Sequence, residues 1–271
     1  MSIFDIFTRK KKINAPWEKY YTKDDLKYKI PDITMYDQIV ESTKKYPNNV
    51  AIKYMGKTIN YKSLLKKIDI CAKGFHSLGI KQGDIVTIML PNVPEALISF
   101  YALNKIGAVV NILHPLLSEN EVKNALNAYS TVMLVAMDIS YAKIKNIVSE
   151  TNVYKVVVIS AKDSMGSIMK IGYEITQGRK VEKPKASELY IYWKDFYTKG
   201  LRYSGSHVEV VGLRDTPAVI LQSGGSTGTP KGIVLSNGNF NSATIAATKA
   251  YPDLCSEDRI LGFYQFFMGL V

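Results

Sequence analysis

A loop of glycines and hydroxyl-bearing residues is the part of the chain whose residue types could do chemistry. It joins two apolar runs, 219–221 and 233–235, and it closes on Pro230, Lys231 and Gly232. Glycines let backbone N–H groups approach an anion closely, because they have no Cβ. Hydroxyls add further donors, and a lysine adds a mobile positive charge. Together these features predict a site for the phosphates of a nucleotide. The residues assigned to it are Ser223, Gly224, Gly225, Ser226, Thr227, Gly228 and Lys231.

This loop differs from two common phosphate-binding motifs. The nucleoside-triphosphatase motif has Gly-Lys-Ser/Thr at the start of a helix, whereas Lys231 precedes Gly232 and an apolar run. The stretch also lacks the G-x-G-x-x-G turn of dinucleotide-binding proteins. A flexible connection is the competing interpretation of any Gly/Ser/Thr segment. The two flanking apolar runs and the Pro-Lys-Gly sequence favour a fixed shape instead.

Short apolar runs alternate with helix-like segments before and after the loop. Strands are expected at 51–54, 57–60, 85–90, 108–113, 131–136, 154–160, 216–221 and 233–235. Helices are expected at 36–46, 61–78, 94–105, 118–128, 141–149, 193–203 and 239–251. The first two strands form a hairpin, and Ser118 and Glu121 have the spacing of a capping box. The alternation that follows predicts βαβ units on a parallel sheet, and hence an α/β fold that holds the loop at one strand end.

We expect three parts along the chain. Residues 1–33 form an irregular lead-in, 34–205 an α/β subdomain, and 206–271 the start of a second subdomain that carries the loop. Between 161 and 185 the alternation breaks, and glycines, lysines and Pro184 predict a surface linker. The last run, 260–271, is strongly apolar and has no cap or polar tail. We therefore expect the fold to continue beyond it, with a C-terminal domain absent from the chain.

Composition bounds the class of protein. The 271 residues, 46% hydrophobic and 22% charged, indicate an ordinary globular protein with a sizeable core. A net charge of +11 favours anionic partners. The lysines are spread along the chain without a nucleic-acid-binding motif, so we expect no nucleic-acid partner. Cys71 and Cys255 lie far apart, which fits a reducing cytosol, and the three histidines lack metal-ligand spacing.

The first twelve residues combine apolar side chains with a basic cluster at 9–12. A secretory signal has the reverse order and a longer apolar core. No apolar run in the sequence is long enough to span a bilayer. A short amphipathic segment in peripheral contact with an anionic membrane is one interpretation, and a frayed terminus is the other. The expected location is the cytoplasm.

At the loop, the sequence resembles the adenylate-forming superfamily of acyl-CoA synthetases, luciferases and peptide-synthetase adenylation domains. The family signature is S/T-G-S/T-T-G-x-P-K-G, and residues 225–228 and 230–232 match it in order. Gly224 departs from the serine of many members. The pair Gly224-Gly225 after Leu221-Gln222 is similar to bacterial long-chain fatty acyl-CoA ligases. Matches at 59–64, 83–92 and 107–115 extend the resemblance, which runs from about Pro16 to the last residue.

The resemblance implies a fold and an activity. The fold is a Rossmann-like parallel sheet flanked by helices, the first part of the large N-terminal domain of such a ligase. The implied activity is ATP-dependent activation of a carboxylic acid, expected to be a fatty acid, to acyl-AMP. Coenzyme A would then convert acyl-AMP to acyl-CoA. Mg²⁺ is expected to accompany ATP, and no residue of the chain is assigned to the metal.

The resemblance also implies residue roles. Ser223, Ser226 and Thr227 would bind the β- and γ-phosphates, and Lys231, as the catalytic residue, would neutralise charge on the pyrophosphate. The candidate acyl-binding residues are Phe263, Phe266 and Met268. An ordinary core strand explains these three equally well.

Departures from the family pattern leave other readings open. Asn237 stands near a position where members usually have histidine, and Phe263 and Phe266 replace the proline and histidine of a P-x-x-H-x-x-G motif. These changes suggest altered or lost activity. The alternatives are a degenerate nucleotide-binding module without turnover, and an adenylation domain for an amino or aryl acid. For the chain alone we expect weak nucleotide or pyrophosphate binding and no turnover.

Overall fold

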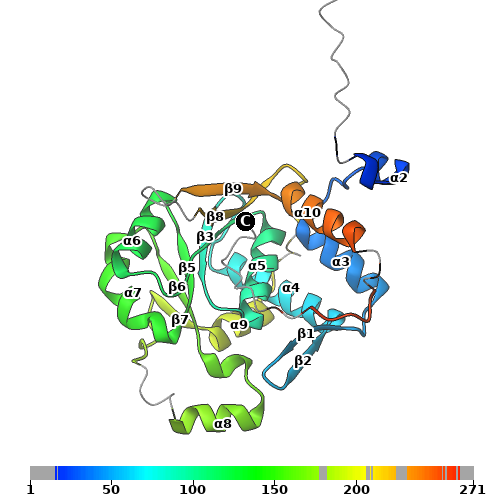
Figure 1. The fold of residues 1–271 in the computed structure, drawn as a ribbon. Helices are drawn as coiled ribbons and strands as arrows, with labels where there is room; N and C mark the ends of the chain where they lie inside the picture. Colours follow the sequence, from blue (N-terminus) through cyan, green and yellow to red (C-terminus); the bar gives the residue numbers. More distant parts are fainter. Residues whose placement is uncertain are drawn as a thin grey trace, which may run out of the picture.

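The computed structural model describes residues 16, 18–176, 182–205, 208, 210–223, 231–251, 253, 255–260 and 262. In this part of the chain a seven-stranded sheet and a two-stranded hairpin are surrounded by helices (Figure 1). The described helices are too short or too polar to cross a membrane.

The large sheet is parallel except at one edge. Its strand order is β7-β6-β5-β3-β4-β8-β9, and only the pair β8 and β9 is antiparallel. The strands are β3 Ile85–Met89, β4 Val109–Ile112, β5 Met133–Met137, β6 Lys155–Ile159, β7 Tyr190–Tyr192, β8 Pro217–Gln222 and β9 Gly232–Ser236. The expected α/β fold with a parallel sheet is therefore confirmed.

Strand β5 shows why these runs become central strands. Every residue of β5 is buried, as expected for a parallel strand covered on both faces. Met133 and Val135 belong to one hydrophobic cluster, and Leu134 and Ala136 belong to another. Because side chains of a strand point alternately to opposite faces, one strand supplies two cores.

Helices cover both faces of the sheet. The longer helices are α3 Met35–Lys45, α4 Tyr61–Ser77, α5 Pro94–Ile106, α6 Glu119–Ala128, α7 Tyr141–Ile147, α8 Ser167–Thr176, α9 Trp193–Arg202 and α10 Asn237–Ala250. Phe75 of α4, Leu103 of α5 and Phe196 of α9 lie in the first cluster, whereas Leu126 of α6 and Ile144 of α7 lie in the second. Helices α4, α5 and α9 therefore pack on one face, and α6 and α7 on the other (Figure 1).

Local signals set several element ends, among them the predicted capping box and hairpin. The Ser118 side chain accepts from the backbone N–H of Glu121, whose carboxylate accepts in return from Ser118, which completes the capping box of α6. Helix α5 begins with Pro94 and ends at Gly107, which has φ of 78°. A residue with a Cβ is strained at that angle, so glycine is the natural stop. Strands β1 Val50–Tyr54 and β2 Lys57–Asn60 form the expected antiparallel hairpin.

Two elements lie where the sequence predicts a linker at 161–185: helix α8 and the 3-10 turn η4 Ala161–Ser164. The short strand β7, at 190–192, follows that segment and was not predicted. The prediction of irregular structure was wrong at α8, because Gly166 and Gly172 flank and interrupt a short apolar repeat. Strand β7 has three residues, too few to show an alternating pattern. Other short elements are the 3-10 turns η1 Glu18–Tyr20, η2 Asp138–Ser140 and η3 Val148–Glu150, and the five-residue helix α2 Lys23–Lys27.

The sheet runs across the expected boundary at residue 206. Strand β8, which follows that boundary, pairs with β4, which precedes it. Residue 206 is therefore not a boundary between sheets in the described part of the chain. The division into subdomains stays a prediction. Most of the apolar run at 260–271 lies outside the described residues.

Candidate nucleotide site

The predicted loop follows the carboxyl end of β8. Strand β3 pairs with β4 on one side and with β5 on the other, so the order of strands reverses at β3. In open α/β sheets, ligands bind outside the carboxyl ends of the strands near such a reversal. Strand β8 lies beside β4, on the same side of β3. The fold thus brings Ser223 and Lys231, the two ends of the loop, to the edge where this architecture places ligands.

The base of the loop is closed by two hydrogen bonds. The backbone N–H of Ser223 donates to the carbonyl of Lys231 over 2.8 Å, and the backbone N–H of Lys231 donates to Ser223 Oγ over 3.1 Å. Below them, Gln222 and Gly232 form the last register pair of β8 and β9. The structure therefore brings together the two described residues of the predicted phosphate site.

Lys231 is exposed, and no described acidic residue lies within ion-pair distance of it. A lysine already held by a carboxylate would have little charge to offer a phosphate. Among the residues that the structure describes, this ammonium group is left available to an anion.

The other predicted site residues lie outside the described part of the chain. They are Gly224, Gly225, Ser226, Thr227, Gly228, Phe263, Phe266 and Met268. Their roles stay predictions.

A chain of polar side chains crosses the sheet beneath the loop. Gln222 Nε2 donates to Asn111 Oδ1 over 3.0 Å, and Asn111 Nδ2 donates to Thr87 Oγ1 over 2.9 Å. Thr87 Oγ1 lies 2.8 Å from Thr131 Oγ1. Asn111, Thr87 and Thr131 are fully buried. Buried polar groups of this kind are stable only when paired, so the chain ties β8 through β4 to β3.

The sequence alone did not assign this row of hydrogen-bonded side chains to the site. Gln222 and the segment 107–115, which contains Asn111, matched a family pattern only, and Thr87 and Thr131 gave no signal. An asparagine in the middle of a buried apolar strand was the available clue, because such an amide needs polar partners on neighbouring strands.

Asn237 begins α10 and is almost fully buried, with 2% of its surface exposed. Its Nδ2 donates to the carbonyl of Leu213 over 3.1 Å. Its Oδ1 accepts from the backbone N–H of Met35 at 3.1 Å and from Asn104 Nδ2 at 2.8 Å. A neutral imidazole has one donor and one single-lone-pair acceptor, so it could not make these three bonds. These three hydrogen bonds, which connect the start of α10 to Leu213, Met35 and Asn104, explain why asparagine suits this position.

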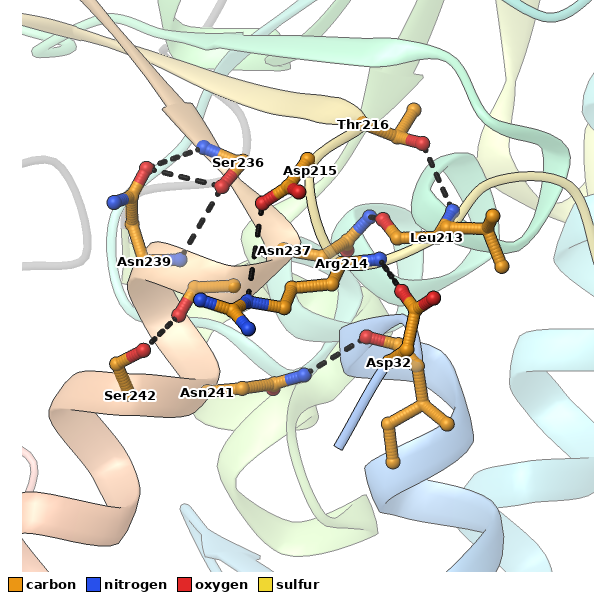
Figure 2. A network of polar contacts seen from close by, with 12 residues as sticks. Asp32, Leu213, Arg214, Asp215, Thr216, Ser236, Asn237, Asn239, Asn241 and Ser242 are labelled. Atoms are coloured by element: carbon orange, nitrogen blue, oxygen red, sulfur yellow. Dashed lines mark hydrogen bonds and ion pairs between the residues drawn. The ribbon is translucent and has the colours of Figure 1, made fainter. Parts of the chain in front are cut away.

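The surrounding contacts pin the β9–α10 connection to the start of the fold (Figure 2). Asn239 Oδ1 accepts from the backbone N–H and the hydroxyl of Ser236, and Asn241 Nδ2 donates to the carbonyl of Ile33 over 3.0 Å. The backbone N–H of Arg214 donates to Asp32 Oδ1 over 2.9 Å. The far end of β9 is therefore fixed independently of the loop.

The described residues were also compared with the geometry of metal sites. No group of three or more described His, Cys, Asp or Glu side chains is arranged to hold a metal ion.

Comparison with known proteins gives the family. The AMP-binding enzyme family matches residues 39–270. The chain is 26% identical over 254 residues to the long-chain-fatty-acid–CoA ligase of Bacillus subtilis, covering 93% of the chain and 45% of that protein. It is also 26% identical to the acetyl-coenzyme A synthetase of Deinococcus radiodurans, covering 74% of the chain and 30% of that protein. The chain spans less than half the length of these relatives.

Solved structures share the fold. The anthranilate CoA ligase AuaEII, solved with anthranoyl-AMP, aligns with a TM-score of 0.66 and 17% identity over 85% of this chain and 39% of that one. The acetoacetyl-CoA synthetase of Streptomyces lividans aligns with a TM-score of 0.59 and 19% identity, over 76% of this chain and 31% of that one. The match of the family over most of the sequence decides the assignment: the chain belongs to the AMP-binding enzymes, with acyl-CoA ligases and synthetases among its relatives.

Proposed function

We propose that the chain supplies the triphosphate-binding part of an ATP-dependent acid–thiol ligase. The observation that carries this proposal is the closed loop base at the carboxyl edge of the sheet, where Ser223 and Lys231 hold each other and the ammonium group has no described ion-pair partner. In the proposed reaction, a carboxylate oxygen attacks the α-phosphorus of ATP, and pyrophosphate leaves. Coenzyme A thiolate then attacks the acyl carbon, and AMP leaves.

The chain contributes charge and position to the first step. Negative charge builds on the leaving pyrophosphate as its bond to the α-phosphorus breaks. A preorganised ammonium and hydroxyl donors stabilise that charge without reorganising at the moment of reaction. We assign this role to Lys231 as the catalytic residue, with Ser223, Ser226 and Thr227 and the N–H groups of Gly224, Gly225 and Gly228 as the phosphate donors. Mg²⁺ would be held by the phosphate oxygens, since we assign it no residue of this chain.

The acid is proposed to be a fatty acid, bound against Phe263, Phe266 and Met268. The similarity to the Bacillus subtilis ligase supports this choice, although acetyl-coenzyme A synthetases match over much of the same length. Both coenzyme A chemistry and the acid step are proposed for a whole ligase. In a longer ligase that contains this chain, acid-dependent ATP–pyrophosphate exchange with a long-chain fatty acid, acetate and an aryl acid separates these substrates. Exchange with none of them would favour a nucleotide-binding module.

The expected cytoplasmic location is kept as part of this proposal. Membrane contact through residues 1–12 stays a prediction, since those residues lie outside the described part of the chain.

The direct test is calorimetric titration of ATP into the wild type and a Lys231→Ala variant. A charge-assisted hydrogen bond to phosphate contributes about 1.5–3 kcal/mol, so the variant should bind ATP roughly 10- to 100-fold more weakly. Lys66→Ala is the matched control, because Lys66 is an exposed lysine of α4 and its loss changes the net charge equally. Equal ATP affinity in the Lys231 and Lys66 variants would refute the assignment.

A further inference from the structure

Tyr129 touches both strands that carry the loop. It follows α6 as its C-cap, and its ring packs against Gly232, where an added Cβ would overlap the phenol. Its hydroxyl lies 3.4 Å from Gln222 Oε1. Gln222 and Gly232 are the last paired residues of β8 and β9 below the loop. One half-buried side chain from another part of the fold therefore contacts each strand immediately beneath Ser223 and Lys231.

The Tyr129 hydroxyl joins the end of the row of hydrogen-bonded side chains that runs from Gln222 to Thr131. The Tyr129 hydroxyl donates to the Gln222 carbonyl oxygen, and the Gln222 amide donates to Asn111 Oδ1. Asn111 in turn donates to Thr87, which is paired with Thr131. Each amide accepts on one side and donates on the other, so the hydrogen bonds polarise one another along the chain. The Gln222 amide is held in one orientation by Tyr129 at its exposed end and by the buried chain at the other.

We propose that Tyr129 is a positioning residue that clamps the base of the phosphate loop through Gln222 and Gly232. This inference rests on the proposed function, because that function supplies the triphosphate that the clamped loop would bind. Fixing the last pair of β8 and β9 fixes the direction in which Ser223 and Lys231 leave the sheet. A displacement of about 1 Å at such a base is enough to misplace donors that must reach phosphate oxygens together.

The test compares the affinities of variants for ATP and for AMP by calorimetry. Tyr129→Phe keeps the ring on Gly232 and removes the hydroxyl, and it should bind ATP roughly two- to tenfold more weakly. Its affinity for AMP should change less than twofold, because AMP lacks the β- and γ-phosphates. Tyr154→Phe is the control: this tyrosine also donates one hydrogen bond, to the Leu78 carbonyl over 3.1 Å, at the start of β6 and far from the loop.

A second variant tests the ring contact. Gly232→Ala adds a Cβ that would overlap the Tyr129 ring, so it should weaken ATP binding on its own. In a Tyr129→Ala background the space is free, and the same alanine should have little further effect. This non-additivity is a signature that a general loss of stability would not give.

Each outcome decides a different claim. ATP affinities of Tyr129→Phe and Tyr154→Phe that both equal the wild-type value would overturn the clamp and leave the proposed function standing. An equal loss of AMP and ATP affinity, or additive effects of the two alanines, would also overturn the clamp. A wild type that binds neither ATP nor pyrophosphate would overturn the proposed function and the clamp with it.

Discussion

Asn237 joins three segments of the chain through one amide. It donates to the Leu213 carbonyl and accepts from the Met35 backbone N–H and the Asn104 side chain, and the last two bonds are buried. Removing the amide would leave the buried Met35 N–H and Asn104 Nδ2 without this acceptor, whereas the Leu213 carbonyl would keep its bond from the Thr216 N–H. Each unpaired buried group costs about 1–3 kcal/mol. At the scale of the residue, the hydrogen-bond capacity of an amide is what suits Asn237 to this place.

Replacing Asn237 with aspartate tests that account. Asn237→Asp keeps the size of the side chain but faces the Leu213 carbonyl with a carboxylate oxygen. We expect the free energy of unfolding at neutral pH to fall by about 2–4 kcal/mol, because a buried donor is lost and a charge is buried. Urea denaturation measures this change. Asn124→Asp, at an exposed position of α6, is the control, and a loss no larger than that of the control would contradict the role of Asn237.

At the scale of elements, η4 is held against α5 by a buried carboxyl group. The Ser164 hydroxyl donates to Glu95 Oε2, and the Glu95 residue is 6% exposed. Burial raises the pKa of Glu95 above its usual value, and the Ser164 hydrogen bond opposes that shift only in part. Asp163, whose pKa is also raised by burial, lies near it, as do Lys57 and Tyr54.

The raised pKa of Glu95 predicts a loss of stability as pH rises. In the folded protein the carboxyl group keeps its proton more tightly than in the unfolded chain. That contribution is fully present below the unfolded pKa of about 4.5 and is lost as pH rises through the folded pKa. Glu95→Gln removes the titration. The free energy of unfolding of the variant, relative to wild type, should therefore increase as pH rises from about 4.5 through the folded pKa of Glu95.

Urea midpoints between pH 4 and pH 7 check this sign. Glu121→Gln should show the opposite trend, because hydrogen bonds from the Ser118 side chain and then its backbone lower the pKa of Glu121. Its contribution is present above the unfolded pKa and lost as pH falls. A difference between Glu95→Gln and wild type that stays constant with pH would contradict the account of Glu95.

Elements with strong periodicity were predictable, and joints between distant elements were not. The hairpin, α4, α5 and the capped α6 follow from apolar spacing, capping residues and Gly107. Lys105, Asp69 and Tyr36 form a hydrogen-bonded cluster between α5, α4 and α3, with Lys105 Nζ 2.8 Å from Asp69 Oδ1. Nothing local marks these three residues as partners. The same holds for Tyr129 and Gly232, which meet only because α6 ends beside β9.

At the scale of the whole molecule, the order of the strands puts Ser223 and Lys231 at the carboxyl edge of the sheet. Reversal of the strand order at β3 leaves the carboxyl ends of β3, β4 and β8 as neighbours. The sequence predicted that Ser223 and Lys231 belong to one loop, and the structure brings these two residues together. Their role in phosphate binding stays a proposal. The net charge of +11 adds a general attraction for a triphosphate, which falls with added salt.

Phosphorus-31 NMR of ATP titrated with the chain tests most directly whether this loop base holds the triphosphate tail. The account predicts that the β- and γ-phosphorus resonances shift or broaden with wild-type protein more than the α-resonance does. Lys231→Ala should largely abolish these changes, while Lys66→Ala should retain them. Resonances unchanged by the wild type, or changed equally by all three proteins, would contradict the claim that Lys231 and its loop bind the β- and γ-phosphates.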